Sequence, residues 1–209
     1  MNTGKAGFLS FCAIVALANA AKADIVMFSD NFNTETLVLN YTGFANWDVS
    51  DGTVDLIGAP SFFDLIPGHG RYVDLDGSTG NAGTMTTKPS LGWTFSTGQR
   101  YRLEFDLAGN QRGGAVDTVV LSVAVGNLAP QSIMSNSNTP LTHYIFEWIG
   151  NGSTGGISFA AAGGDNVGQL LDNVQLTMIP LPPAAWAGLG SLAGVACIGA
   201  IRRRKNATI

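Results

Sequence analysis

A strict two-residue alternation of apolar and polar side chains is the strongest constraint on how this chain folds. In the segment 101–107, aromatic or aliphatic residues occupy every odd position and charged residues every even one. A period of two predicts a β-strand with one buried face. Segment 119–125 repeats the pattern, and segment 142–148 puts Tyr144, Phe146 and Trp148 on one face with His143 and Glu147 on the other.

Shorter alternating or β-branched segments extend this pattern over the middle of the chain. The candidates are 25–28, 47–49, 54–57, 72–75, 84–87, 157–160 and 170–177, separated by turns rich in Gly, Asn, Asp and Ser. Between residues 24 and 178 no segment has the pattern of a long helix. Many short strands at roughly even spacing predict an all-β fold, a jelly-roll-like β-sandwich.

The N-terminus has the pattern of a cleaved secretory signal. Lys5 supplies a positive charge, an apolar run covers 7–17, and small-x-small sites end at Ala20 and Ala23. We expect a signal peptide over 1–23 with cleavage after Ala23, and Ala20 as the second choice. The alternative is a buried N-terminal helix, which a run this short does not favour.

The C-terminus has three parts: a proline-rich segment, an apolar segment and a basic tail. Residues 184–201 carry no charge and would reach about 27 Å as a helix, just enough to cross a bilayer. We expect a transmembrane helix there, because no polar face recurs as it would in a helix lying on the membrane surface. The flanking residues are Ile179, Pro180, Leu181, Pro182 and Pro183 before it and Arg202, Arg203, Arg204 and Lys205 after it.

In this order, the three parts resemble the PEP-CTERM class of bacterial sorting signals, in its V-P-L-P-A variant. The resemblance covers residues 179–205, with Ile179 in place of Val and Pro183 in place of Ala. It implies a Gram-negative bacterium and an exosortase, an integral-membrane enzyme that cuts near the proline motif. It also implies an inner-membrane intermediate and a final place at the cell surface or in an extracellular polysaccharide matrix.

The domain between the two terminal signals is acidic and lacks cysteine. It holds five of the chain's Lys and Arg residues and all fifteen Asp and Glu residues, for a net charge near -10. Such a charge argues against nucleic acid as a partner, because phosphates select cationic surfaces. Cys12 and Cys197 lie in the terminal segments, so no disulfide can form within the domain.

Five segments of the domain resemble, in order, the galactose-binding-like jelly rolls of plant cell-wall proteins and their bacterial relatives. They are Asn46–Val49, Val54–Ile57, Val73–Gly77, Tyr101–Asn110 and Leu171–Val174. The resemblance spans residues 28–177 within a domain that we place at 24–178. It implies a β-sandwich that associates with polysaccharide without catalysis. The matching segments are framework strands, so no sugar-contacting residue carries over.

The strand pattern directs the carboxylate of Asp172 inward, in phase with Val174 and Leu176. A buried carboxylate needs hydrogen-bond donors or a cation. The jelly-roll resemblance implies a structural calcium ion between the first and last strands, which would bring Asp30 or Asn31 towards Asp172. The alternative, a bond from Asp172 to loop backbone amides, is favoured, and no other cofactor is expected.

A second acidic segment, Asp74-x-Asp76-Gly77, is similar to a calcium loop. It lacks the spacing and the closing Glu of an EF-hand. We therefore interpret it as a strand end followed by an Asx-type turn.

Catalytic motifs are sparse in this sequence. Neither G-x-S-x-G nor H-E-x-x-H occurs. Glu104 and Glu147 would be neighbours if their strands pair, but solvated strand-face charges are the favoured interpretation. The aromatic residues Phe62, Phe63 and Trp93 are candidates for stacking on a glycan, with core packing as the alternative for Trp93.

Together these patterns predict an exported, non-catalytic protein that associates with extracellular polysaccharide. Its expected partners are an exosortase-type enzyme, a polysaccharide and, through residues 184–201, a membrane. Two alternatives stay open: a carbohydrate-active hydrolase or lyase on the same sandwich, and a purely structural matrix component.

Overall fold

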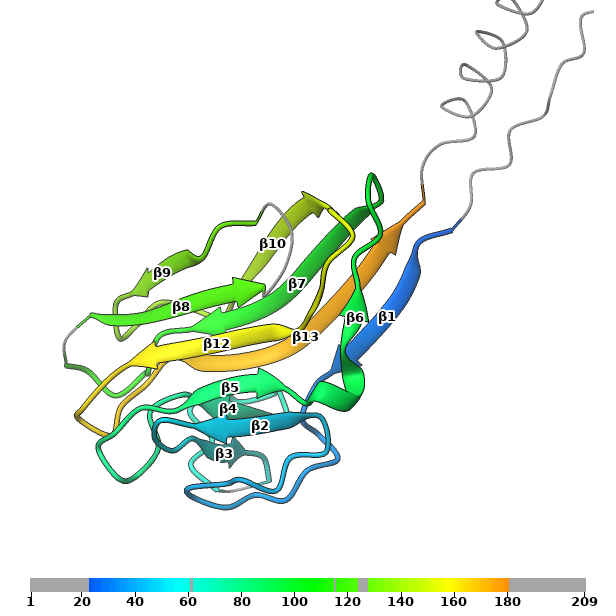
Figure 1. Ribbon diagram of the computed structural model, residues 1–209. Helices are drawn as coiled ribbons and strands as arrows, with labels where there is room; N and C mark the ends of the chain where they lie inside the picture. Colours follow the sequence, from blue (N-terminus) through cyan, green and yellow to red (C-terminus); the bar gives the residue numbers. More distant parts are fainter. Residues whose placement is uncertain (1–22, 61, 115, 124–127, 181–209) are drawn as a thin grey trace, which may run out of the picture. The chain divides into compact units, whose positions relative to one another are not determined.

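The computed structural model describes residues 23–60, 62–114, 116–123 and 128–180 of the chain. These form two antiparallel sheets (Figure 1). Sheet A contains six strands: β10 (Thr142–Ile149), β7 (Arg100–Ala108), β13 (Leu170–Ile179), β4 (Arg71–Asp74), β3 (Asp55–Gly58) and β1 (Ile25–Asp30). Sheet B contains five strands: β2 (Trp47–Ser50), β5 (Thr84–Thr87), β12 (Ile157–Ala162), β8 (Asp117–Val123) and β9 (Gln131–Ser135).

Strand β13 is the centre of sheet A. It pairs with β7 along one edge, while β4 and β1 follow one another along its other edge. A two-stranded ladder of β6 (Trp93–Thr94) and β11 (Thr154–Gly155) lies outside the two sheets, preceded by a 3-10 turn at Pro89–Leu91. Because the chain passes repeatedly from one sheet to the other, its strands interleave as in a jelly roll.

Most of the predicted strands are confirmed, with ends that differ by one to two residues. The alternation in β7 places Tyr101, Leu103, Phe105 and Leu107 in the core. Strand β10 buries Trp148 and exposes His143 and Glu147, as its pattern predicts. Strands β6, β9 and β11 were not predicted, because they are short and lack a clear alternation.

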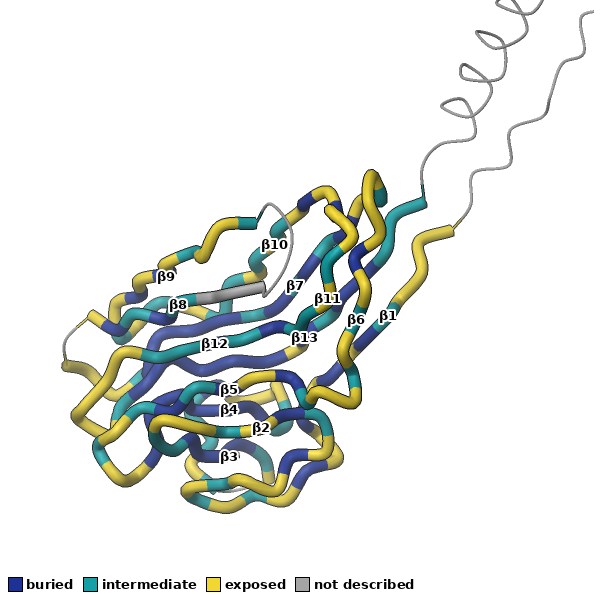
Figure 2. The backbone as a smooth tube through the Cα atoms, viewed as in Figure 1, coloured by how far each residue is buried: buried dark blue, intermediate teal, exposed yellow. Residues whose placement is uncertain are grey.

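The main core lies between the sheets and is built largely from aromatic rings. Phe105 of β7 meets Phe159 of β12 edge to face, with ring centroids 5.0 Å apart. Trp47 lies 5.9 Å from Phe159 and 5.7 Å from Phe28 of β1, so its ring links both sheets. Because the domain has no cysteine, disulfides do not stabilise it. The burial of these rings does, since each removes a large apolar area from water. Figure 2 shows buried residues recurring along β7 and β13, and all four residues of β3 are buried.

A second, smaller cluster lies on the outer side of sheet A. Its buried members are Ile57, Ile66, Tyr72, Ala108 and Leu170, with Leu39, Phe62, Leu65 and Leu141 packed against them. These residues come from β3, β4, the ends of β7 and β13, and the loops around them. This end of the outer face is therefore covered by loops.

Several predictions fall on the chain ends. The signal peptide, the helix 184–201, the basic tail 202–205 and motif residues 181–183 lie outside the described residues, apart from Ala23. Of the parts that are described, no helix is long and apolar enough to cross a membrane. The first motif residue, Ile179, is the last residue of β13 and pairs with Arg100, so the sheet extends one residue past the predicted domain end.

Candidate functional site

A small pocket opens beside the second cluster, where loops cover the outer side of sheet A. Its volume is about 60 Å³. Side chains from both strands of the β3–β4 ladder and from four separate loops line it: Leu39, Asp55, Ile57, Phe63, Asp74, Ser78 and Arg112. We call this the Phe63 pocket. It combines an exposed aromatic ring, a buried acid, a guanidinium and a hydroxyl, which makes it the strongest candidate for ligand binding.

Phe63 is the exposed wall of this pocket. Its side chain is 58% exposed and its backbone has a φ of 53°. That left-handed conformation is a real outlier for a bulky residue, and such strain gathers at functional sites. The ring of Phe62 lies 5.2 Å away, edge to face, and packs against the second cluster. The two rings thus diverge at a turn, which leaves one of them exposed.

Tyr72 of β4 fixes the loop that carries Phe63. Its hydroxyl accepts hydrogen bonds from the backbone N–H groups of Leu65 and Ile66, the second at 3.0 Å. The same hydroxyl lies 3.3 Å from the carbonyl oxygen of Phe63, to which it can donate. Burial raises the pKa of Tyr72 to about 12, so the group remains a neutral phenol. The loop is held in place before any ligand arrives.

The start of the same loop needs glycine. Gly58 ends β3 with a φ of 121° and exchanges two backbone hydrogen bonds with Phe62. A Cβ atom at this position would collide with the carbonyl oxygen of Gly70. Only glycine therefore allows the chain to turn back here.

Asp74 is the buried acid of the pocket, with a side chain only 1% exposed. One carboxylate oxygen accepts the backbone N–H groups of Asp76 and Gly168, at 3.1 and 2.9 Å. The other forms an ion pair with Arg112. Burial raises the pKa of Asp74 to about 7, although the Arg112 charge and the two amides lower it. The bond from Asp76 confirms the Asx-type turn.

Asp55 lies directly opposite Asp74 in the β3–β4 ladder. Its Oδ1 accepts the backbone N–H groups of Asn40 and Ser78, at 2.7 and 3.2 Å. Its Oδ2 accepts the Ser78 hydroxyl at 2.7 Å. Both oxygens therefore serve to hold loops in place.

Arg112 has more guanidinium N–H donors than it uses in hydrogen bonds to the described residues. Its side chain is 33% exposed, and within the described residues its one side-chain partner is Asp74. A guanidinium carries five N–H donors. The remaining donors are available to a ligand at the pocket mouth, beside the Phe63 ring.

The proposed metal ligands, Asp30 and Asp172, have protein partners in this structure. Asp30 accepts hydrogen bonds from the Phe32 backbone N–H at 2.9 Å, the Asn46 amide at 3.0 Å and the Trp47 indole at 2.9 Å. Across the described residues, no group of three or more His, Cys, Asp or Glu side chains is placed to hold a metal ion. Both carboxylate oxygens of Asp30 are thus occupied by protein donors.

Asp172 is buried as predicted, but not in phase with Val174. A bulge between Asp172 and Gln175 shifts the register, and Asn173 takes a φ of 52° there. Asp172 thus lies opposite Asp106, a residue that alternates with core residues of β7. Its Oδ1 accepts the Asn173 backbone N–H at 2.7 Å, and burial raises its pKa to about 7. The inward direction predicted from the sequence is therefore wrong.

The other residues considered from the sequence are Trp93, as a glycan-stacking ring, and Glu104 and Glu147, as a pair of acids. Their positions do not favour these roles. Trp93 is half-buried and packs on Phe28, with ring centroids 5.5 Å apart, so the core alternative holds for it. Glu104 and Glu147 lie on paired strands but are not opposite one another. Glu147 pairs with Arg100 at 2.6 Å, and Glu104 lies 3.2 Å from the Arg102 Nε.

No protein-family model and no curated protein matches this chain. Several solved structures resemble it weakly. One holds the CBM22-1 and GH10 modules of a Clostridium thermocellum xylanase with xylohexaose, at 13% identity and a TM-score of 0.43 over 75% of this chain; the chain spans 29% of that protein.

Two further similar structures are single binding modules. The CBM22-1 xylan-binding domain of Paenibacillus barcinonensis Xyn10C has 13% identity and a TM-score of 0.44, covering 78% of this chain and 99% of that one. A Cellvibrio mixtus lichenase module with cellotriose has 11% identity and a TM-score of 0.40, covering 73% and 97%. At these scores the likenesses carry no argument about ligand or activity.

Proposed function

We propose that this chain is an exported, non-catalytic module that binds extracellular polysaccharide through the Phe63 pocket. The observation that carries the proposal is the rigidly held, exposed Phe63 ring beside the Asp74–Arg112 ion pair. Sugar rings present C–H groups on their faces and hydroxyls on their edges, and binding sites combine apolar walls with a few placed polar groups to match them. One aromatic wall next to guanidinium donors meets both needs.

The size of the pocket defines how a sugar would bind. A volume of about 60 Å³ admits one or two hydroxyl groups or a hydroxymethyl group, but no complete sugar ring. The ring would therefore lie over Phe63 and direct a hydroxyl oxygen towards Arg112. Such a shallow site buries little ligand surface, so we expect weak binding to each sugar and stronger binding to a polymer that offers many.

The same geometry argues against the hydrolase or lyase alternative. A general acid or base needs a carboxyl group free to exchange a proton with the substrate. In the Phe63 pocket, both oxygens of Asp55 hold loop groups, and both oxygens of Asp74 accept amides or the guanidinium. Glu104 and Glu147 are committed to ion pairs on the outer strand face. We propose no catalytic role for these groups.

Binding is tested with residues 23–181, which form a compact unit. The wild type is passed over immobilised polysaccharides next to Phe63→Ala and Met134→Ala. Met134 is 72% exposed on β9, so it provides a matched surface substitution away from the pocket. We expect Phe63→Ala alone to reduce retention. Equal retention of all three, or no retention of the wild type at millimolar sugar, would exclude the pocket as a glycan site.

The sorting half of the proposal rests on the sequence of the chain ends. We propose that an exosortase-type enzyme recognises Ile179, Pro180, Leu181, Pro182 and Pro183 after the segment 184–201 enters the inner membrane of a Gram-negative bacterium. Arg202, Arg203, Arg204 and Lys205 would stay on the cytoplasmic side. The product would then reach the cell surface or the extracellular matrix.

Mass spectrometry of the protein recovered from its native cell surface tests this half independently. We expect an N-terminus at Asp24 and a C-terminus within or close to 179–183. Because Ile179 is bonded into the sheet, cleavage on its C-terminal side leaves β13 complete. Recovery of an intact chain from the cytosol would refute the sorting proposal and leave the glycan proposal standing.

A further inference from the structure

Strand β10 is an unusual edge of sheet A. It has eight residues, pairs with β7 along its whole length without a register shift, and contains no Pro, Gly or Lys. Within the described part of the chain, β7 is its one neighbour in the sheet. Its other edge therefore presents a row of backbone donors and acceptors, and proteins normally protect such an edge.

The remaining sheet edges are protected or short. Strand β3 has four residues, and its outer side is bridged by Val38 and Phe62. Strand β1 has a register shift between Val26 and Phe28 that breaks its regular edge. Strands β2 and β9 have four and five residues. β10 is thus the longest regular edge that the described strands leave open, and Figure 1 shows it at the border of the sheet.

The side chains of β10 are self-complementary about its centre. Ile145 is the middle of the outward-facing residues and is 53% exposed. Two residues before it is His143, and two residues after it is Glu147. In an antiparallel pair of β10 strands related by a twofold axis at Ile145, residue 145 meets its own counterpart, and each His143 meets the other copy's Glu147.

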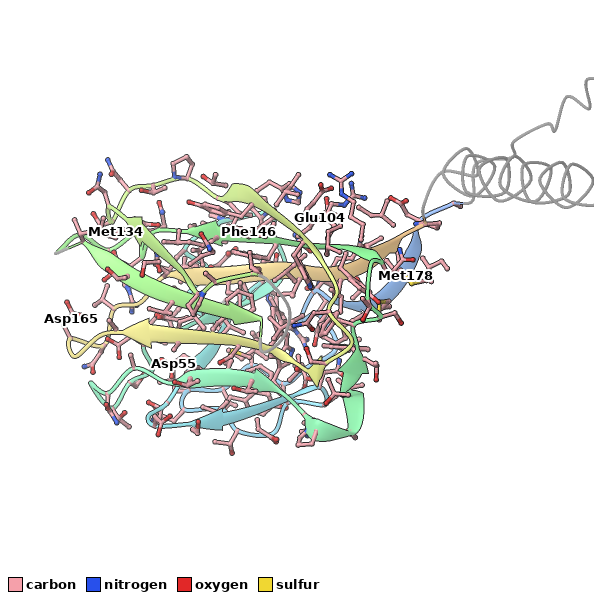
Figure 3. All side chains as sticks on the ribbon, turned by 45° about the horizontal axis from the view of Figure 1, so that its top comes forward. Asp55, Glu104, Met134, Phe146, Asp165 and Met178 are labelled. Atoms are coloured by element: carbon pink, nitrogen blue, oxygen red, sulfur yellow. The ribbon has the colours of Figure 1, made fainter. Side chains whose placement is uncertain are left out.

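The inner-facing residues also match in this register. Tyr144 would lie opposite the other copy's Phe146, and both rings already stack beside Phe105, at 5.6 and 6.0 Å. Aromatic cross-strand pairs stabilise a sheet. Figure 3 labels Phe146 on β10 and Glu104 on the neighbouring β7.

His143 lies beside two carboxylates of β7. Its Nδ1 lies 2.7 Å from the Asp106 carboxylate and its Nε2 lies 3.5 Å from Glu104. The hydrogen bond to Asp106 raises the pKa of His143, so the ring is positively charged over a wider pH range than a free imidazole. A protonated His143 would therefore face the other copy's Glu147 at both ends of the central Ile145 contact, where each Glu147 also pairs with Arg100 of its own copy at 2.6 Å.

We infer that β10 joins two copies of this chain into a twofold-symmetric dimer in which sheet A continues from one copy into the other. The occupant of this edge is a second copy, because the strand complements itself in charge and in side-chain type. The Phe63 pocket lies at the opposite, β3–β4 end of sheet A, so the dimer would carry two pockets far apart. A dimer of this kind could bridge two polysaccharide chains.

Cysteine cross-linking tests the register directly. In the full chain, purified in a mild detergent, Cys12→Ser and Cys197→Ser remove both native thiols. Ile145→Cys in this background should form an intermolecular disulfide under mild oxidation, because residues opposite one another across a strand pair lie close enough for a bond. Met134→Cys, which is more exposed but lies on β9, should cross-link much more slowly. Equal rates for the two variants would overturn the inference.

Sedimentation of Ile145→Lys provides the second measurement. Glu104 lies opposite residue 145 on β7, so the new lysine has an acidic neighbour and the folded chain should keep its melting temperature. Across the dimer axis, however, lysine would meet lysine. We expect association about tenfold weaker than in the wild type. A wild type that sediments as a monomer at high concentration, or an Ile145→Lys variant that associates equally, contradicts the dimer.

Discussion

The outer face of sheet A is covered by loops at one end and open at the other. Over β3 and β4, loops cover it, form the second cluster and enclose the Phe63 pocket. Over β7 and β10, the same face is open and carries charged residues in regular alternation with the core. Both regions contain an ion pair between an arginine and a carboxylate, Asp74–Arg112 in the covered region and Arg100–Glu147 in the open one.

The two ion pairs differ in burial, and therefore in how much each one contributes to stability. The Asp74 side chain is 1% exposed, whereas those of Arg100 and Glu147 are 53% and 32% exposed. A carboxylate without water depends on its partners, while water replaces a lost partner on an open strand face. Polar groups over β3 and β4 are therefore part of the folded structure, whereas those over β7 and β10 are solvated and contribute little to stability.

Removing the arginine from each ion pair should give the largest difference in the free energy of unfolding between the two regions. Arg112→Met leaves Asp74 buried without its cation, and we expect a loss of about 2–3 kcal/mol in the free energy of unfolding at pH 8. Arg100→Met should cost less than about 0.5 kcal/mol. Urea denaturation of residues 23–181 measures both. Equal losses would mean that loop burial does not distinguish the two regions.

The next largest effect is a dependence of stability on pH. Burial raises the pKa of Asp172 in the folded state to about 7, from the 3.8 of an exposed aspartate. Between these values the unfolded chain releases a proton that the folded chain keeps, so stability falls as pH rises from about 4 towards 8. The loss from Asp172 should be on the order of 2 kcal/mol by pH 8, and Asp74 acts in the same direction.

Asp172→Asn isolates this contribution. The variant should match the wild type near pH 4 and unfold at higher urea concentration at pH 8. Asp48→Asn, at an exposed position on β2, controls for the loss of one negative charge from an acidic domain. A wild-type stability that rises between pH 5 and pH 8 would show that Asp172 is ionised at little cost in the folded state.

Tyrosine hydroxyls provide a third comparison of the two regions. Tyr72→Phe removes the group that accepts the Leu65 and Ile66 amides, and we expect a loss of about 1–2 kcal/mol. Tyr144→Phe on β10 removes a hydroxyl for which the structure shows no hydrogen bond among the described residues, so its cost should be close to zero. Thermal melts measure the difference. Faster amide exchange at residues 62–66 in Tyr72→Phe alone would locate the effect in the loop.

How far the sequence predicts the fold depends on how regular each element is. The alternation in β7 and β10 determines both strands and their faces, because a period of two admits one assignment. Strand β9 was missed because Gln131–Ser135 is short and mostly polar. The phase of Asp172 was mispredicted because the bulge before Gln175 depends on a left-handed Asn173, which no periodicity shows.

The Phe63 pocket was less predictable than the sheets. Two of its residues had a signal in the sequence: Phe63 in an adjacent aromatic pair, and Asp74 in a segment similar to a calcium loop. Asp55, Asp74, Ser78 and Arg112 are far apart in the chain and come together only after β3 pairs with β4 and the loops fold over them. Contacts of that kind depend on the tertiary structure of the loops, so local patterns do not reveal them.

Phe63→Gly gives the smallest expected effect and separates recognition from stability within the covered region. Glycine adopts a positive φ without strain, so the variant should be no less stable than the wild type, although its unfolded chain gains entropy. Loss of the ring should weaken binding to an oligosaccharide by about fivefold, the typical contribution of one aromatic contact. Calorimetry on the same samples measures both quantities. A variant that is destabilised but still binds would mean that the left-handed Phe63 supports the loop fold rather than the ligand, and that the strain serves packing over β3 and β4.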